Sequence, residues 1–294
     1  ALASLDAPTS VAADRCLLAR SQPHPNDLDA GYGAYVGGGA TLSIASSNLL
    51  DNHTVALAVS DAGTSATVTG SVIARTQPRP RDQRGGIGAL VTLGANLSLE
   101  STALRENHGM GVASGLDGAI VRARTSVIAG TLPEPDGAEG IGVLATLGAL
   151  ELESCLVRDS RVAAVLVGQA PANATITRSF LYGVSEGTFH TYDGIERIVD
   201  TFGGVGDGIV TTFQANVTVT DTLVRDASRV ALLFHESGGS IRGVDAAAEH
   251  YGLVLQGGSL PDWDHPSNRF SGGDQAVVQQ GSLPVPAPPP LPSD

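Results

Sequence analysis

The chain has 294 residues, with 37 glycines, a charged fraction of 16% and an aromatic fraction of only 4%. The low aromatic content argues against a globular α/β enzyme of this size, whereas small residues are typical of many short strands joined by tight turns. The net charge of −13 argues against a nucleic-acid-binding face and against binding to anionic lipid. No segment has the roughly 20 consecutive apolar residues that a membrane-spanning helix needs.

The chain begins at Ala1, without an initiator Met or a signal sequence, which is consistent with a mature form or with the C-terminal part of a longer protein. The two cysteines, Cys16 and Cys155, do not fall at equivalent positions of the repeat described below, and we expect many structural units between them. Because bridged Cα atoms must lie within about 7 Å of each other, we expect two small buried side chains and no disulfide.

A Ser/Thr-x-Pro-x-Pro pattern recurs every 55 residues, starting at Ser21, Thr76 and Thr131. An Asp follows each copy within two residues, and a Gly-x-Gly then leads into an apolar segment. A loop that recurs at a fixed period indicates a stack of similar units.

Short segments in which apolar and polar residues alternate predict strands within each unit. In chain order they are 11–19, 33–36, 40–44, 47–52, 66–74, 88–91, 95–99, 101–107, 119–129, 142–145, 149–152, 154–160, 174–181, 208–211, 215–219 and 222–226.

Each half of a unit is interpreted as one coil of about 20–30 residues that contains three short strands. Stacked coils form a parallel β-helix that rises about 4.8 Å per coil, so nine or ten coils make a rod of about 45 Å. The strict hexapeptide period of left-handed β-helices is absent. We therefore predict an all-β, right-handed parallel β-helix with loop insertions in alternate coils. It forms a single domain over residues 1–280, and a Pro-rich extended tail follows at 281–294, outside the fold.

The successive patterns Gly-(Ile/Val)-x-(Val/Leu), Gly-Ala-x-Leu-x-(Leu/Ile) and Ser-x-Leu-x-x-Asn resemble those of bacterial right-handed parallel β-helix repeat proteins of the pectin-lyase-like superfamily. The resemblance covers roughly residues 10–280. It implies an extracellular or cell-surface protein, and several enzyme families of that superfamily act on polysaccharides. Because the matching residues pack the core or form turns, they indicate the fold and not an activity.

The regular spacing fails at loop 185–204, where a longer aromatic segment stands in place of a fourth Pro-rich loop. Long loops on rigid scaffolds often form binding sites. Two rings that can stack on a sugar and four side chains that can bond hydroxyls are the candidate ligand-binding residues: Phe189, His190, Tyr192, Asp193, Glu196 and Arg197. The alternative is a self-packed loop or a lid over the side of the rod. A second polar segment, residues 262–265, is expected to cap the last coil.

Lyases of the superfamily use clustered Asp residues for calcium, and its hydrolases use paired carboxylates. Asp51, Glu106 and Asp159 recur in alternate coils and are interpreted as a solvated column. Because no catalytic pair and no metal-ligand spacing is found, we expect no catalytic residue, metal or cofactor.

We therefore predict a non-enzymatic, secreted or cell-surface module with a structural, adhesive or glycan-binding role, whose partner is a polysaccharide or another surface protein. The alternative is a polysaccharide lyase or glycoside hydrolase of the same superfamily, with its site at loop 185–204.

Overall fold

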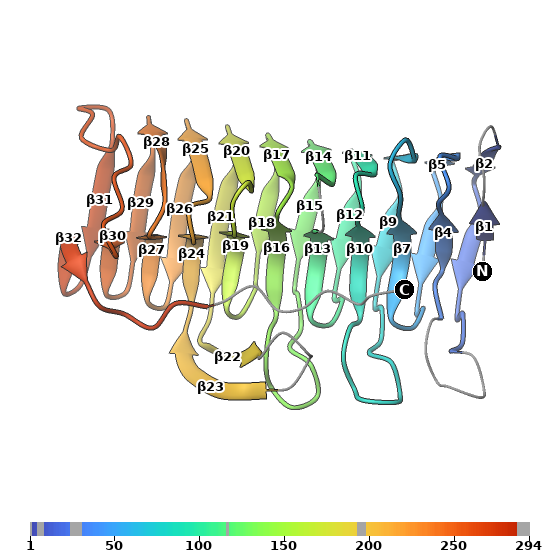
Figure 1. Cartoon of the computed structure of the whole chain (residues 1–294), viewed down its shortest axis with the longest axis horizontal. Helices are drawn as coiled ribbons and strands as arrows, with labels where there is room; N and C mark the ends of the chain where they lie inside the picture. Colours follow the sequence, from blue (N-terminus) through green and yellow to red (C-terminus); the bar gives the residue numbers. More distant parts are fainter. Residues whose placement is uncertain (1, 5–8, 24–30, 116–117, 193–197, 287–294) are drawn as a thin grey trace.

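The computed structural model of the chain describes residues 2–4, 9–23, 31–115, 118–192 and 198–286. These residues form a right-handed parallel β-helix, as predicted, in which three parallel sheets run along a rod (Figure 1). None of the described segments forms a helix long and apolar enough to cross a membrane.

We name the three sheets A, B and C in the order in which the chain passes through them. Sheet A contains β1 (Leu2–Ser4), β4 (Ala34–Val36), β7 (Val55–Val59), β10 (Ile87–Val91), β13 (Met110–Ser114), β16 (Ile141–Thr146), β19 (Ala163–Gly168), β24 (Asp207–Thr212), β27 (Val230–His235), β30 (Tyr251–Gln256) and β32 (Gln275–Gly281). Sheet B contains β2 (Ser10–Asp14), β5 (Thr41–Ala45), β8 (Ser65–Thr69), β11 (Asn96–Glu100), β14 (Ile120–Arg124), β17 (Ala149–Glu153), β20 (Asn173–Thr177), β25 (Asn216–Thr220) and β28 (Gly238–Arg242). Sheet C contains β3 (Leu17–Ala19), β6 (Asn48–Leu50), β9 (Val72–Ala74), β12 (Ala103–Arg105), β15 (Val127–Ala129), β18 (Leu156–Arg158), β21 (Phe180–Val184), β26 (Leu223–Ala227), β29 (Asp245–Ala248) and β31 (Arg269–Gly272).

The 55-residue repeat corresponds to two coils of unequal length. Val55 of β7 pairs with Ile87 of β10, 32 residues later. Ala89 of β10 pairs with Val112 of β13, 23 residues later. The longer coil of each pair contains the Pro-rich loop, which explains why this loop appears only in alternate coils.

The core is a column of apolar side chains that point inward from each strand. Ile44 and Leu99, in β5 and β11, are both fully buried, whereas Ser43 between the inward residues of β5 is exposed. This alternation places every second residue of sheet B in the core, as the period-two pattern of the sequence predicts. Burial of these columns, together with strand pairing between coils, stabilises the rod.

A ladder of small polar side chains lines the turn between sheets B and C. Each member follows a residue in the left-handed conformation, such as Arg15 (φ 51) or Ser154 (φ 55). The backbone N–H of one member donates to the side chain of the next, as Cys155 does to Ser179 Oγ at 3.2 Å. The ladder consists of Cys16, Ser47, Ser71, Thr102, Ser126, Cys155, Ser179 and Thr222.

The two cysteines therefore occupy the same position in their coils, and our expectation of non-equivalent positions was wrong. Cys takes the place of Ser or Thr in the ladder, because its Sγ also points to a backbone carbonyl, at 3.2 Å from Ala123 O for Cys155. Both thiols are free, and Cys155 is buried as expected, whereas Cys16 is only half-buried because it lies near the N-terminal end of the rod.

Buried asparagines fix the start of the Pro-rich loops. Asn107 Oδ1 accepts hydrogen bonds from the backbone N–H and the hydroxyl of Thr76, at 3.1 and 2.7 Å. Asn52 Oδ1 accepts one from the backbone N–H of Ser21, at 3.1 Å. The Ser/Thr of the repeated motif is therefore the residue by which each of these loops is tied to the next coil.

The strands in the middle of sheet A are buried on both faces, unlike those of sheet B. The strands β7, β10 and β13 have no exposed residue. Their outward side chains join a second apolar cluster, which also contains Leu283 and Val285. Residues 282–286, which we expected to begin a tail outside the fold, therefore pack against sheet A, and residues 287–294 lie outside the described part of the chain. The outward column consists of Ala58, Leu90, Ala113, Leu144, Leu166, Val210, Leu233 and Val254.

Candidate functional site

The expanded segment forms an antiparallel hairpin of β22 (Gly187–Tyr192) and β23 (Ile198–Val205). It leaves the rod between β21 and β24, on the same edge as the Pro-rich loops (Figure 1). The hairpin thus takes the fourth place in the row of insertions, where the sequence spacing fails.

The aromatic residues of the hairpin pack its strands onto the rod. Phe189 is 1% exposed and belongs to the outer apolar cluster of sheet A. Its ring stacks on Phe202, with centroids 5.2 Å apart, and Phe202 is 36% exposed. Phe189 therefore presents no open ring face to a sugar, contrary to the role that we expected for it.

The other candidate residues of this segment are only partly described. Tyr192 lies in β22 and pairs with Ile198. Asp193, Glu196 and Arg197 lie outside the described residues, and ligand binding by these three remains a prediction.

His190 connects the hairpin to the Pro-rich loop at 131–140. Its ring is 7% exposed, and its Nε2 lies 3.1 Å from Asp136 Oδ2 while its Nδ1 lies 2.9 Å from Thr201 Oγ1. A carboxylate only accepts hydrogen bonds, so Nε2 donates to Asp136 and, in the neutral ring, Nδ1 accepts from the Thr201 hydroxyl. The backbone N–H of Glu139 donates to Thr188 O at 2.8 Å in the same contact. His190 thus fastens the hairpin, and both of its nitrogens are already engaged.

Two buried glutamates lie in the same loop. Glu134 is 6% exposed and accepts a hydrogen bond from the backbone N–H of Gly85 at 2.8 Å. Burial raises the pKa of Glu134 to about 7. Glu139 is 2% exposed, and burial, reinforced by the charge of Glu134, raises its pKa to about 8. We call Glu134, Asp136, Glu139 and His190 the carboxyl junction, because loops 76–86 and 131–140 and the hairpin meet there.

Sequence reasoning overlooked the two glutamates of the junction. Glu139 adopts a left-handed conformation (φ 62) just before Gly140, and Gly85 (φ 85) precedes Gly86 at the same point of the preceding loop. A left-handed Glu is unusual, since Gly is the residue that adopts this conformation without strain. In the sequence, the one signal was that Glu139 stands at the position where the preceding loop has Gly85.

The junction is rich in carboxylates but does not resemble a metal site. Among the residues that the structure describes, no group of three or more His, Cys, Asp or Glu side chains is arranged to hold a metal ion. Neutral carboxyl groups near pH 7 can donate protons, which is the chemical capacity of Glu134 and Glu139.

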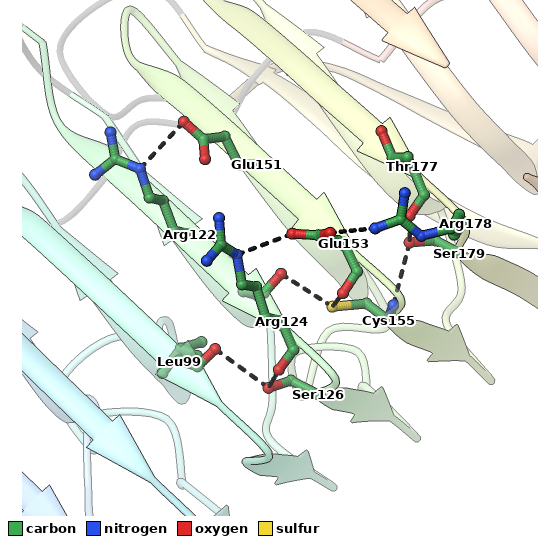
Figure 2. A network of polar contacts seen from close by, with 11 residues as sticks. Leu99, Arg122, Arg124, Ser126, Glu151, Glu153, Cys155, Thr177, Arg178 and Ser179 are labelled. Atoms are coloured by element: carbon green, nitrogen blue, oxygen red, sulfur yellow. Dashed lines mark hydrogen bonds and ion pairs between the residues drawn. The ribbon is translucent and has the colours of Figure 1, made fainter. Parts of the chain in front are cut away.

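A second polar network covers the outer face of sheet B (Figure 2). Arg122 pairs with Glu151 at 3.1 Å, and Arg124 pairs with Glu153 at 2.9 Å, while Arg178 approaches Glu153 from the other side. All five side chains are between 38% and 58% exposed. Because exposed ion pairs contribute only about 0–1 kcal/mol each, we interpret this network as a solvated ladder between coils.

The acidic residues predicted in alternate coils are separated by residues of the intervening coils. Asp51 occupies its expected corner but forms an ion pair with Arg75 of the next coil at 2.7 Å, which lowers the pKa of Asp51. This contact agrees with a structural and solvated role.

Segment 262–265 caps the C-terminal end of the rod, as expected. Asp262 pairs with Ser240 beyond the edge of sheet B. Trp263 packs against the end of the core and meets Phe270 edge-on, with centroids 6.1 Å apart. The only Trp of the chain is thus used for packing.

No protein-family model and no curated protein sequence matches the chain. Among solved structures, pectate lyase Pel9A superposes with a TM-score of 0.54 at 12% identity, over 93% of this chain and 74% of the lyase chain. The catalytic domain of a GH87 α-1,3-glucanase in complex with tetrasaccharides gives a TM-score of 0.44 at 8% identity, over 92% of this chain and 61% of the glucanase chain. The likeness to the lyase, at 12% identity, shows a common fold and nothing about activity. The chain is thus similar, in its fold, to pectate lyase Pel9A, a right-handed parallel β-helix.

Proposed function

We propose that the chain is a non-enzymatic β-helix repeat protein, secreted or at the cell surface, that acts as a structural, adhesive or glycan-binding module. The observation that carries this proposal is the closed state of the hairpin. Phe189 is buried against the rod, and both ring nitrogens of His190 are engaged by Asp136 and Thr201. The described side chains that were the best candidates for a catalytic or sugar-binding cleft hold the fold together instead.

A polysaccharide lyase or glycoside hydrolase is the second candidate. One observation favours it, since Glu134 and Glu139 have pKa values of about 7 and about 8, as a general acid requires. Their exposures of 6% and 2% oppose it, because a substrate oxygen must come within hydrogen-bond distance of the acid. Catalysis at the carboxyl junction therefore requires the hairpin to open.

The two candidates predict different results on a panel of acidic and neutral polysaccharides, tested with and without calcium. Reducing ends and unsaturated products report turnover, and retardation in polysaccharide-containing native gels reports binding. We expect no turnover on any polymer. Turnover that disappears in Glu139→Gln or Glu134→Gln, but persists in the exposed control Glu236→Gln, would establish the enzyme and refute the proposal.

A further inference from the structure

An aromatic pair lies on the outer face of sheet C, outside the hairpin and the carboxyl junction. Phe180 and Tyr182 point outward from β21 and stack on each other, with ring centroids 4.8 Å apart and an interplanar angle of 27°. Phe180 is 37% exposed, and its neighbours in the same column are the half-buried residues Leu156 and Leu223. The partly exposed Phe180, the half-buried Tyr182 and these two aliphatic side chains form an apolar platform on a rigid sheet.

Arginines flank this platform on both sides. Tyr182 pairs with Arg158 of β18 in one direction and with Arg225 of β26 in the other. Arg225 forms an ion pair with Asp245 at 2.6 Å, and Arg158 pairs with Asp159. The guanidinium groups are thus held beside the rings by neighbouring carboxylates, and they offer planar sets of N–H donors.

A groove begins where these strands end. It has a volume of about 510 Å³ and is lined by residues 183–185, 226–228 and 247–249. Asp226 and Glu249 supply exposed carboxylates, and Ser185 supplies an exposed hydroxyl. The groove follows Tyr182 and Arg225 directly along their own strands, so it begins beside the platform.

Two polar atoms at this surface have no hydrogen-bond partner in the described structure. They are Arg225 Nη1 and Ser228 Oγ, and both are buried from solvent. Because neither atom is in contact with solvent, a ligand in the groove cannot reach them unless these side chains move, and the proposal below does not use them.

The charges of this surface select the class of ligand. Two guanidinium groups, of Arg158 and Arg225, face four carboxylates, of Asp159, Asp226, Asp245 and Glu249, and the whole chain has a net charge of −13. The surface thus carries excess negative charge, which repels an anionic polymer. Binding sites for small apolar faces combine rings with a few well-placed polar groups, and a pyranose presents an apolar C–H face together with hydroxyls that donate to carboxylates.

We propose that Phe180, Tyr182 and the adjoining groove bind a neutral polysaccharide. A sugar ring packs its C–H face on the Phe180–Tyr182 pair, and its hydroxyls reach the exposed carboxylate of Asp226. The inference rests on the glycan-binding form of the proposed function, and it assigns that function to sheet C instead of the hairpin.

The test measures binding of the full chain to neutral β-glucan and glucomannan and to anionic polygalacturonate, by affinity gel retardation and titration calorimetry. The variants are Phe180→Ala, Tyr182→Ala and Asp226→Asn, with Leu260→Ala as the control, since Leu260 is 88% exposed and does not line the groove. Circular dichroism checks that each variant is folded, and Tyr182→Phe serves as a milder change that keeps the ring.

We expect a neutral polymer to bind the natural chain. Phe180→Ala and Tyr182→Ala should bind this polymer at least tenfold more weakly. Tyr182→Phe, which keeps the ring, and Leu260→Ala should bind it as tightly as the natural chain does. If a neutral polymer binds but both alanine variants bind as well as the natural chain, the platform is not the site, although a glycan-binding function stands. If only polygalacturonate binds, the ligand class is wrong. If no polymer binds, the glycan-binding function itself is refuted, and this proposal with it. If sedimentation shows that the natural chain is a dimer and that Phe180→Ala abolishes the dimer, the platform is a contact between two copies of the chain, and the proposal is overturned.

Discussion

Arg229 and Asp207 form a buried ion pair on the outer face of sheet A, with Arg229 Nε donating to Asp207 Oδ1 at 2.8 Å. Asp207 is fully buried and Arg229 is 8% exposed. Arg229 Nη1 also donates to the carbonyl of Pro284 at 2.8 Å, so one side chain joins β24, β27 and the C-terminal segment. Gln256 adds a pair of hydrogen bonds to the backbone of Leu283, each at 2.9 Å.

Removing one partner of this pair should destabilise the rod strongly. Arg229→Ala leaves the Asp207 carboxylate buried without a counter-charge, and we expect a loss of about 3–5 kcal/mol in the free energy of unfolding. Urea denaturation followed by circular dichroism measures this loss. Arg15→Ala is the control, because its ion pair with Asp14 is exposed and should change stability by less than about 1 kcal/mol. Equal effects of the two variants would show that the buried pair has no special role.

The carboxyl junction should make the stability of the chain depend on pH. The pKa values of Glu134 and Glu139 lie above the ordinary 4.5, at about 7 and about 8, because burial disfavours their charged forms. Their contribution to the free energy of unfolding is therefore fully present at pH values below 4.5, and it is lost as the pH rises through about 7 and about 8.

Glutamine at position 139 cannot ionise and isolates this contribution from those of other groups. We expect Glu139→Gln to unfold at a higher urea concentration than the natural chain near pH 9, by an amount on the order of a few kcal/mol, and at a similar concentration near pH 5. Glu236→Gln, at an exposed position, should follow the natural chain at every pH. A constant offset between Glu139→Gln and the natural chain across this range would contradict the assignment.

The packing of the hairpin against the rod should depend on Phe189 more than on Phe202. Phe189→Ala removes a ring that is 1% exposed and should lower the free energy of unfolding by about 3–5 kcal/mol. If the hairpin opens independently of the rod, the same change should release the hairpin alone. Phe202→Ala removes a ring that is 36% exposed and should lower the free energy of unfolding clearly less than Phe189→Ala does. Limited proteolysis reports cleavage within residues 187–205, and urea denaturation reports global stability. The same protease sensitivity in both variants would show that Phe189 does not anchor the hairpin.

The inward face of sheet B can be tested with two neighbouring residues of β11. Leu99→Asp places a charge in the dry core and should unfold the adjacent coils or lower the melting temperature by well over 10 °C. Ser98→Asp places the same charge on the outer face opposite Arg122, where it should change little. A melting temperature that is equally low in both variants would reverse the assignment of faces.

Local patterns were sufficient for most of the fold. The 55-residue period and the alternation around Ile44 and Leu99 reflect side chains that repeat on stacked coils, and the structure confirms both. The Cys positions were misjudged, because Cys16 and Cys155 replace Ser or Thr in a ladder whose hydrogen bonds are visible only once the coils are stacked.

The position of the irregular insertion was predicted, but its packing was not. The break in spacing at loop 185–204 correctly marked the irregular insertion, since a change in loop length is visible in one sequence. The burial of Phe189 and the contact between His190 and Asp136 were not predicted, because the two loops are 54 residues apart in the chain.

The sequence by itself determined that this chain is a β-helix, that its loops lie on one edge in alternate coils, and which side chains point inward. These properties repeat within every coil, and local alternation encodes them. Only the tertiary structure decided that the hairpin closes on the rod, that Glu134 and Glu139 are buried together, and that Phe180 stays partly exposed beside Tyr182, which lies between two arginines. Each of these depends on which coils become neighbours and on what covers each face, and neither is encoded in a local pattern of residues.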